Sequence, residues 1–569
     1  MIPTRVICKT RCFAAFTMFT IAAACAPGGA APAPARTSPE ITVQDVRSRI
    51  FLDVDDSMLG RQSGTLGNFK MTEYLQREVA RLGLAPGGEN GTFFQTVPMV
   101  RRSVDSAATT MTVGGRQLAL FTEFAPLRPN MTERYAASLR RGEYQTVFGG
   151  RAGDSTGILP PHAVAGKIVV LQAPIDSNAK PSGVWGTAGA ISRSKYPTAA
   201  AIAIAALDLV TPVSLAGLRG MSTGVTPRES GPAAFLISNA AAEEILGGRP
   251  SAMQPGAGGK TVTAALRFDD RPVPYAARYV IAIVRGSDAR LKDEYVAIGA
   301  HSDHVGISAR PVDHDSLRSY YRVMRPEGAQ RRGAQPGPPT PAQWERIRRS
   351  IDSLRRIRPP RPDSINNGAD DDGSGSVALL EIAEALATGE RPRRSVLLIW
   401  HTAEEGGLLG SAWFTEYPTA PRNAIVAQLN MDMVGRGSAT DIVGGGPRYL
   451  QVIGSRRLST DLGDVVDSVN TRTNAYTIDY SWDAPGHPMS RYCRSDHYMY
   501  ARKGIPIAYF SRGYHSEYHV VTDEPQYINY EGLAKVSRFI RDIGVALANR
   551  DTRPSVDKPV QNPLLPCRQ

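Results

Sequence analysis

The sequence predicts an α/β protein in which a mostly parallel, mixed sheet is sandwiched by helices and a second, β-rich domain is inserted. Three observations support this fold class. Strand-like and helix-like segments alternate from residue 279 onward, as in sheets whose parallel strands are joined by crossover helices. Residues 117–271 differ in character, with short apolar runs between Ala- and Gly-rich pieces. The apolar run 396–400 is typical of a strand buried on both faces of such a sheet.

The first 25 residues have the pattern of an export leader. Arg5, Lys9 and Arg11 precede an apolar core at 12–24 that is too short to span a bilayer. Small residues then allow two outcomes: lipoprotein processing at Cys25, or plain cleavage in the Ala-rich stretch. Residues 26–40 have the composition of a disordered tether. We therefore expect an exported protein: periplasmic, an outer-membrane lipoprotein or extracellular.

The remaining cysteines give little guidance. Cys8 and Cys12 belong to the leader with Cys25, which leaves Cys493 and Cys567, and these two do not predict a disulfide framework. No later stretch is apolar enough for a transmembrane segment.

The main domain is expected in two parts. Residues 41–116 open it with a helical pattern at Met71, Leu75, Val79 and Leu82, and Gly83 is a plausible C-cap. Residues 117–271 then form the inserted domain, with strands such as 167–171 and 234–237. Residues 272–550 complete the main domain, with expected strands at 279–284, 295–298, 396–400, 425–429 and 505–510 and helices at 377–386 and 530–547. The Pro-rich tail 551–569 is expected to be disordered.

An Arg- and Pro-rich insertion, 306–364, interrupts the main domain. It holds thirteen Arg against six Asp or Glu, so more than half of the net charge of +12 lies there. Aromatic residues do not alternate with these arginines as they do in single-stranded nucleic-acid sites, so a nucleic-acid partner is not expected. One helix is predicted, capped by Thr340 with Pro341 in its first turn. The insertion is either a surface loop or a lid over the site.

Two adjacent carboxylates, Glu404 and Glu405, follow the strand at 396–400. Neighbouring carboxylates repel one another unless a cation or a proton relieves the repulsion. Ligands of α/β sheets bind beyond the carboxyl ends of the strands. A solvated acidic loop and a functional site both remain compatible with this stretch alone.

Other metal-ligand residues occur at similar places. They follow predicted strands or lie in Gly-rich turns: His301 in GAHSDH, Asp370 in NNGADDDGSGS, Asp432 in LNMDMVGR and His519 in EYHVVTD. Each alone has a structural explanation, such as a helix N-cap for Asp370. Together, histidines and carboxylates without cysteine are the ligand set of zinc or a comparable divalent ion.

The ordered motifs HSDH, GADDDGSG, AEEGGLLGS, NMDM, SDH and YHVVTD resemble the bacterial zinc aminopeptidases related to glutamate carboxypeptidase. The resemblance covers residues 41–547, with the inserted domain similar to a protease-associated domain. It implies a zinc exopeptidase fold with two Zn²⁺ ions and peptide substrates.

Carried over by position, the resemblance implies His301 and Asp432 on one zinc, Glu405 and His519 on the other, and Asp370 between them. Glu404 would be the general base of a metal-activated water, and Asp303 would orient the His301 imidazole. Tyr492 is at the place of an oxyanion-stabilising hydroxyl.

Other functions are compatible with this fold. A glutaminyl cyclase shares much of the metal set. A carboxypeptidase or dipeptidase for acidic substrates could use Arg436 or Arg512 to bind a carboxylate. A non-catalytic exported binding protein is the alternative outside the enzymes, and the complete ligand set disfavours it.

Overall fold

The computed structural model describes residues 37–127, 137–154, 157–175, 195–225, 231–330, 337–562 and 567–569. The predicted leader, Cys25 and nearly all of the predicted tether lie outside the described residues. Residues 38–569 form one compact unit. Among the described residues, no helix is both long and apolar enough to span a bilayer.

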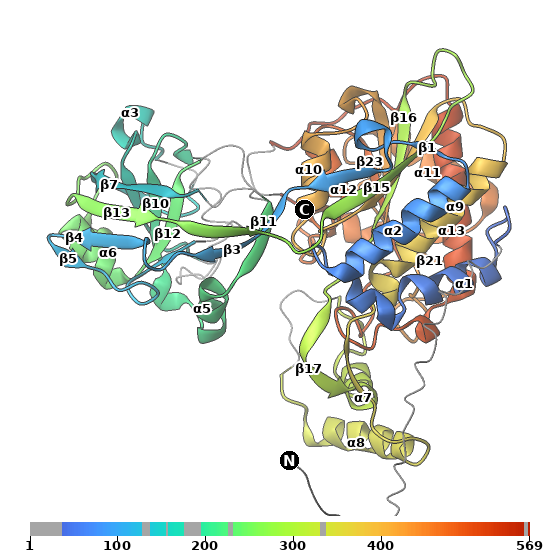
Figure 1. The fold of residues 1–569 in the computed structure, drawn as a ribbon, viewed down its shortest axis with the longest axis horizontal. Helices are drawn as coiled ribbons and strands as arrows, with labels where there is room; N and C mark the ends of the chain where they lie inside the picture. The colour runs from blue at the N-terminus through green and yellow to red at the C-terminus, as the bar shows by residue number, and fades with distance from the viewer. Residues whose placement is uncertain are drawn as a thin grey trace, which may run out of the picture. The chain divides into compact units, whose positions relative to one another are not determined.

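The central feature is a mixed sheet with the strand order β1-β15-β19-β16-β20-β23-β21-β22, in which β2 also pairs with β15 (Figure 1). Its middle strands β19, β16, β20 and β23 are parallel to one another, and β15 and β21 border them antiparallel. The predicted fold class is confirmed. The strands are β1 (Ala85–Pro86), β2 (Phe94–Val97), β15 (Ala277–Val284), β16 (Tyr295–His301), β19 (Ser395–His401), β20 (Ile425–Met431), β21 (Tyr449–Ile453), β22 (Thr477–Asp479) and β23 (Ile507–Ser511).

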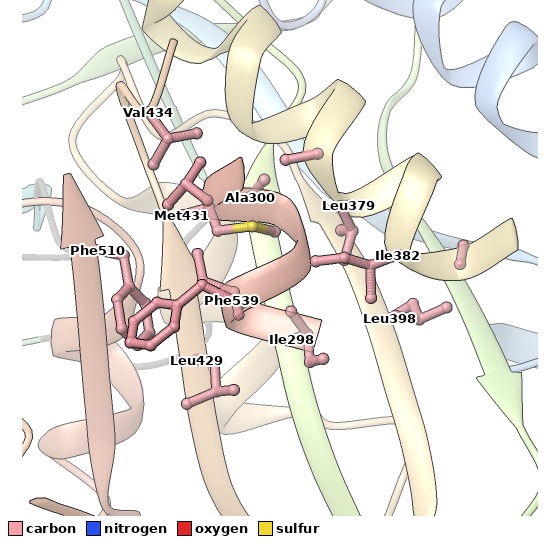
Figure 2. Packing of buried hydrophobic residues seen from close by; sticks show 14 of the residues in the cluster. Ile298, Ala300, Leu379, Ile382, Leu398, Leu429, Met431, Val434, Phe510 and Phe539 are labelled. Carbon is pink, nitrogen blue, oxygen red and sulfur yellow. The ribbon is translucent and has the colours of Figure 1, made fainter. Parts of the chain in front are cut away.

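Helices cover both faces of this sheet. One face packs against α1 (Val43–Asp53), α2 (Leu66–Arg81), α9 (Gly375–Thr388), α11 (Thr460–Thr473) and α13 (Tyr530–Asn549). The other face packs against α10 (Leu409–Glu416) and α12 (His497–Ala501). Side chains of a strand point alternately to the two faces, so Leu398 joins the first core and Leu397 the second. Figure 2 shows the first core, where Leu379 and Ile382 of α9 and Phe539 of α13 meet the sheet.

The β-rich domain contains three sheets, ordered β6-β12-β10-β9-β8, β11-β3-β14 and β5-β4-β13-β7. Because strands from residue 99 onward pair with strands at 262–272, this domain begins before the predicted boundary at 117. Its strands are β3 (Met99–Val104), β4 (Thr110–Val113), β5 (Arg116–Gln117), β6 (Phe124–Pro126), β7 (Leu139–Tyr144), β8 (Thr146–Arg151), β9 (Ile168–Gln172), β10 (Ala201–Ala205), β11 (Ser222–Val225), β12 (Ala233–Ile237), β13 (Val262–Leu266) and β14 (Phe268–Pro272). Its α-helices include α3 (Pro161–Val164), α5 (Pro212–Arg219) and α6 (Asn239–Leu246).

The insertion has more structure than the single predicted helix. A two-stranded ribbon, β17 (Ile307–Asp313) with β18 (Pro362–Ile365), forms its base. The helix α8 (Pro341–Arg355) begins with the predicted Thr340 cap, and Gln343 completes a capping box. A second helix, α7 (His314–Met324), was not predicted. Arg318 of α7 pairs with Glu517, and the backbone N–H of Ala329 donates to the carbonyl of Tyr514 at 2.9 Å, so the insertion contacts the loop that carries His519.

The C-terminal tail contradicts two expectations. Cys493 and Cys567 form a disulfide. Residues 551–562 are described and contact the main domain, since Ser555 donates to the Asp461 carboxylate and the N–H of Asp557 donates to the Leu458 carbonyl. Cysteine spacing alone could not reveal this pairing, because 74 positions separate the two residues.

Candidate metal centre

The candidate site lies at the carboxyl edge of the four parallel strands. β16 ends at His301, Glu404 and Glu405 follow the end of β19, and Asp432 follows the end of β20. The loop after β23 carries His519. Because neighbouring parallel strands end on the same side of a sheet, residues up to 218 positions apart in the sequence (His301 and His519) converge there.

Asp371 is at the middle of this group. Its Oδ1 lies 3.4 Å from His301 Nε2, and its Oδ2 lies 3.0 Å from His519 Nε2. The two oxygens of one carboxylate therefore face two different sets of ligand atoms. Asp432 Oδ2 completes the first set at 3.9 Å from His301 Nε2, and Glu405 Oε2 completes the second at 3.0 Å from His519 Nε2.

Asp370, the residue predicted for this bridging position, faces elsewhere. Its Oδ1 accepts hydrogen bonds from the Gly435 N–H at 2.6 Å and the Ser374 hydroxyl at 3.0 Å. Its Oδ2 lies 3.5 Å from His515 Nε2. Asp372 Oδ1 accepts the Gly375 N–H at the start of α9. The middle aspartate of the DDD motif therefore faces the site, and its two neighbours hold the surrounding backbone.

His304 is a site residue that the sequence did not single out. It is buried, its Nδ1 lies 2.8 Å from Glu405 Oε1, and its ring is 5.6 Å from that of His519. With Asp371 and Glu405 it forms a group whose ligand atoms lie within 4.8 Å of one another. The HSDH motif could have indicated His304 as a site residue, since it is a second histidine three positions after His301. His515, four positions before His519, contacts Asp370 and Asp523 instead.

The carboxylate of Asp303 contacts a different group from the predicted His301 imidazole, which is contacted by the Asp303 backbone. The backbone carbonyl of Asp303 accepts from His301 Nδ1 at 3.0 Å, whereas its carboxylate Oδ1 is 3.7 Å from that nitrogen. The carboxylate accepts the N–H groups of Glu404 at 3.1 Å and Glu405 at 3.4 Å. Asp303 therefore fixes the His301 tautomer through its backbone and the Glu404–Glu405 turn through its side chain.

Tyr492 also lies away from the ligands. It is buried beside Arg457, whose guanidinium is 4.4 Å from its ring centre. The phenol beside the site is Tyr518, whose ring stacks on His519 at 3.8 Å and whose hydroxyl accepts from Arg494 at 3.1 Å.

The electrostatics of the site favour cations. Burial raises the pKa of the Glu404 carboxyl well above its usual range, and Glu405 and Asp432 raise it further. Burial raises the pKa of Asp432 to about 6. Burial lowers the pKa of His519, but Glu405 and Asp371 outweigh this effect and raise it to about 11. Several carboxylates thus share a buried space where like charges are costly.

The residues present fit divalent ions. Two buried ligand atoms, His301 Nε2 and Asp371 Oδ2, have no hydrogen-bond partner among the described residues. Buried polar atoms are normally paired, so one unpaired ligand atom in each of the two groups is consistent with an ion in each group. Imidazole and carboxylate ligands suit zinc and comparable metals.

Part of the chain matches a known protein family. Residues 279–544 match the family model described as Peptidase family M28. Leucine aminopeptidase 1 of Sclerotinia sclerotiorum is 31% identical over 191 residues, covering 32% of this chain and 47% of the relative. A probable leucine aminopeptidase of Arthroderma otae is 39% identical over 93 residues, covering 15% of this chain and 26% of the relative. The chain thus spans less than half the length of these relatives.

Solved structures with a similar fold include an aminopeptidase from Aneurinibacillus sp. strain AM-1, with a TM-score of 0.44 and 15% identity over 91% of this chain and 97% of that one. A zinc aminopeptidase from Bacillus subtilis gives a TM-score of 0.43 and 14% identity over 92% of this chain and 100% of that one.

Proposed function

We propose that the chain, whose residues 279–544 match the family model described as Peptidase family M28, is an exopeptidase. It would remove N-terminal residues from peptides with the help of two divalent ions, zinc in the first instance. The observation that carries the proposal is the Asp371 carboxylate, whose two oxygens face two sets of ligand atoms. A single-metal site would not need both oxygens directed in this way.

The ligands divide into two groups around Asp371. His301 and Asp432 would hold one ion, and Glu405 and His519 would hold the other. His304 would support the second group through its hydrogen bond to Glu405. When bound, the ions would polarise the scissile carbonyl and lower the pKa of the attacking water.

Glu404 is the group available for proton transfer. Glu404 directly precedes the ligand Glu405 in the sequence, its backbone N–H donates to the Asp303 carboxylate, and burial raises the pKa of its carboxyl well above the usual range, in the direction a general base requires. It would accept a proton from the attacking water and donate it to the leaving amine.

Tyr518 is the candidate for stabilising the developing oxyanion. Its hydroxyl accepts from Arg494, so its own proton remains free to be donated toward the site beside His519. This assignment replaces Tyr492, which is buried among other residues.

The residues considered for carboxylate recognition are engaged elsewhere. Arg436 is buried and pairs with Asp441 and Glu517, and Arg512 donates to the Gly446 carbonyl. Both guanidinium groups are buried, so neither is exposed to a C-terminal carboxylate, which favours an aminopeptidase over an acidic-substrate carboxypeptidase or dipeptidase.

We also propose that the protein is exported. The leader-like residues 1–25 support this, and so does the Cys493–Cys567 disulfide, because disulfides persist in oxidising compartments. Mass spectrometry of the mature N-terminus would test it and would distinguish free secretion from a lipid on Cys25.

The activity is tested with a panel of aminoacyl chromogenic substrates, each also in N-acetylated form. We expect hydrolysis of free N-termini only, loss of activity on chelation and recovery with zinc. Glu404→Gln should lower kcat by about 10²–10⁴-fold, the usual contribution of a general base, with little change in bound metal. Full activity of this variant, or hydrolysis of the acetylated series, would contradict the proposal.

A further inference from the structure

A second group of metal-ligand residues lies outside the candidate metal centre. His314, Asp363 and Glu524 each offer a ligand atom, and these three atoms lie within 4.8 Å of one another. His314 begins α7, and Asp363 lies in β18, so both belong to the insertion. Glu524 follows His519 by five positions and belongs to the main domain. The group therefore joins two parts of the chain.

His314 presents an unsatisfied nitrogen to this group. The side chain is 2% exposed. Its Nδ1 side is occupied, since Arg361 Nη2 lies at 2.7 Å and Asp315 Oδ1 at 3.5 Å. Its Nε2 has no hydrogen-bond partner among the described residues, and the nearest carboxylate oxygen, Glu524 Oε1, is 4.0 Å away. A buried polar atom without a partner is costly, and a ligand would remove that cost.

The two carboxylates of the group accept hydrogen bonds, Asp363 Oδ1 from the Ile365 N–H and Glu524 Oε1 from Asn367 Nδ2, but have no Lys or Arg partner among the described residues. Two other acids of the insertion, by contrast, have arginine partners: Asp313 pairs with Arg355, and Asp315 pairs with Arg358 and Arg361. Arginines are therefore available nearby but are directed to other acids.

A further acid increases this negative charge. Asn367 Nδ2 donates to Asp56 Oδ1 at 2.9 Å and to Glu524 Oε1 at 3.4 Å, which places Asp56 beside the group. Burial raises the pKa of Glu524 to about 7, and Asp363 and Asp56 contribute to this shift. A cation between these acids would relieve the repulsion.

We propose that His314, Asp363 and Glu524 bind a divalent cation of the zinc type, at a site separate from the candidate metal centre. One imidazole and two carboxylates are a ligand set for zinc, with a further position for water. Ligation requires a lone pair on His314 Nε2. In the structure, Arg361 Nη2 donates toward Nδ1 at 2.7 Å, so ligation requires this guanidinium to keep only its other acceptor, Asp315 Oδ1, at 2.8 Å. The Nδ1 proton would then face the Asp315 carboxylate, an arrangement that is usual for ligating histidines.

The bound ion would link the insertion to the main domain, next to the loop that carries His519. Glu524 adjoins Asp523, whose carboxylate accepts the N–H groups of Asp370 and Asp371 at 3.1 Å. The site is thus linked through two residues to the backbone of Asp371. The insertion would then be held in a fixed position beside the metal centre and would not open and close over it.

Metal content of the full-length protein tests the site. We expect His314→Gln and Asp363→Asn each to lose one equivalent of zinc relative to the unaltered protein, measured by inductively coupled plasma mass spectrometry after dialysis against micromolar zinc. His162→Gln in α3 and the exposed Asp352→Asn in α8 are matched controls and should lose none. Because the readout is a difference of one equivalent, it is independent of how many ions the candidate metal centre holds.

A second measurement keeps the test decisive if the variants fold poorly. Crystals of the unaltered protein grown with micromolar zinc should give an anomalous difference peak at the zinc edge between His314 Nε2 and Glu524. No peak there, a peak only at millimolar zinc, or unchanged zinc content in folded variants would overturn the proposal. His314 would then simply be a hydrogen-bond donor to Glu524.

Discussion

Asp370 and Asp371 have the same side chain and adjacent positions, but their surroundings give them different tasks. We expect Asp371→Asn to lose most bound metal and to lower kcat/KM by about 10³-fold or more, because both ligand groups share its carboxylate. Asp370→Asn should keep its metal, since its Oδ1 only accepts hydrogen bonds from Gly435 and Ser374. Metal analysis and steady-state kinetics of the pair check this. Equal metal loss in both variants would contradict the assignment.

Asp53 provides a prediction about pH. It is fully buried, neither carboxylate oxygen has a hydrogen-bond partner among the described residues, and burial raises its pKa to about 8. The folded state therefore binds a proton that the unfolded state releases near pH 4, so this group lowers stability as pH rises from about 4 to 8. Asp53→Asn should flatten the decline of Tm over that window, measured by calorimetry. A variant with the same slope as the unaltered protein would argue against this.

The sequence located most of the site at the residue scale because strand ends can be predicted. His301, Glu405, Asp432 and His519 all follow strands of the parallel set, and the structure brings them together. The choice among three consecutive aspartates could not be made, because successive residues point in different directions and only the backbone path decides which one faces the site. The contact of His304 with Glu405 depends on a loop conformation that periodicity does not describe.

At the scale of elements, a buried ion-pair network fixes α1 to α9. Arg49 of α1 pairs with Glu381 and Glu384 of α9, and all three are buried. Arg49→Met would remove the cation beside Glu381 and leave Glu384 with the longer contact to Arg81 at 3.7 Å, so we expect a loss of about 3–5 kcal/mol in the free energy of unfolding. Urea denaturation measures it. Arg47→Met, an exposed position on the same helix, is the control and should change stability by less than about 1 kcal/mol.

Partial rescue would show that unpaired charge is the cause. Adding Glu381→Gln and Glu384→Gln to Arg49→Met should recover part of the lost stability, because neutral amides cost less to bury than carboxylates. No recovery would indicate that packing of the Arg49 side chain accounts for the loss.

The elements that the sequence predicted well are those with strong local signals. The helix at 377–386 corresponds to α9, which ends before Gly389, and α8 begins at its predicted cap. Helix α7 was not predicted, although it carries apolar residues such as Leu317 and Val323, and its position depends on distant partners, such as the pair of Arg318 with Glu517. Local patterns do not record such tertiary contacts.

At the scale of the whole molecule, the alternation of strands and helices was sufficient to predict the fold class. It was not sufficient to predict where the domains and the tail begin and end. The β-rich domain begins earlier than predicted because β3 and β4 pair with the distant strands β14 and β13, at residues 262–272. Long-range strand pairing of this kind leaves no mark in a local window of sequence. The tail was expected to be disordered from its proline content, but its contacts are made by polar residues such as Ser555 with Asp461.

The disulfide gives the last prediction. It joins Cys493 to Cys567 in the tail, and 74 positions separate the two cysteines. Cys493 directly precedes Arg494, the residue that donates to Tyr518. A cross-link over a loop of this length restricts the unfolded chain, so Cys567→Ser should cost about 2–4 kcal/mol. The tail after residue 551 should also become accessible to limited proteolysis, since the cross-link is one of its anchors. Calorimetry and mass spectrometry of the digest measure these effects, and a reducing agent should lower the Tm of the unaltered protein but leave that of the variant unchanged. If the protein purified from an oxidising compartment has two titratable thiols, the tail is not held in this way.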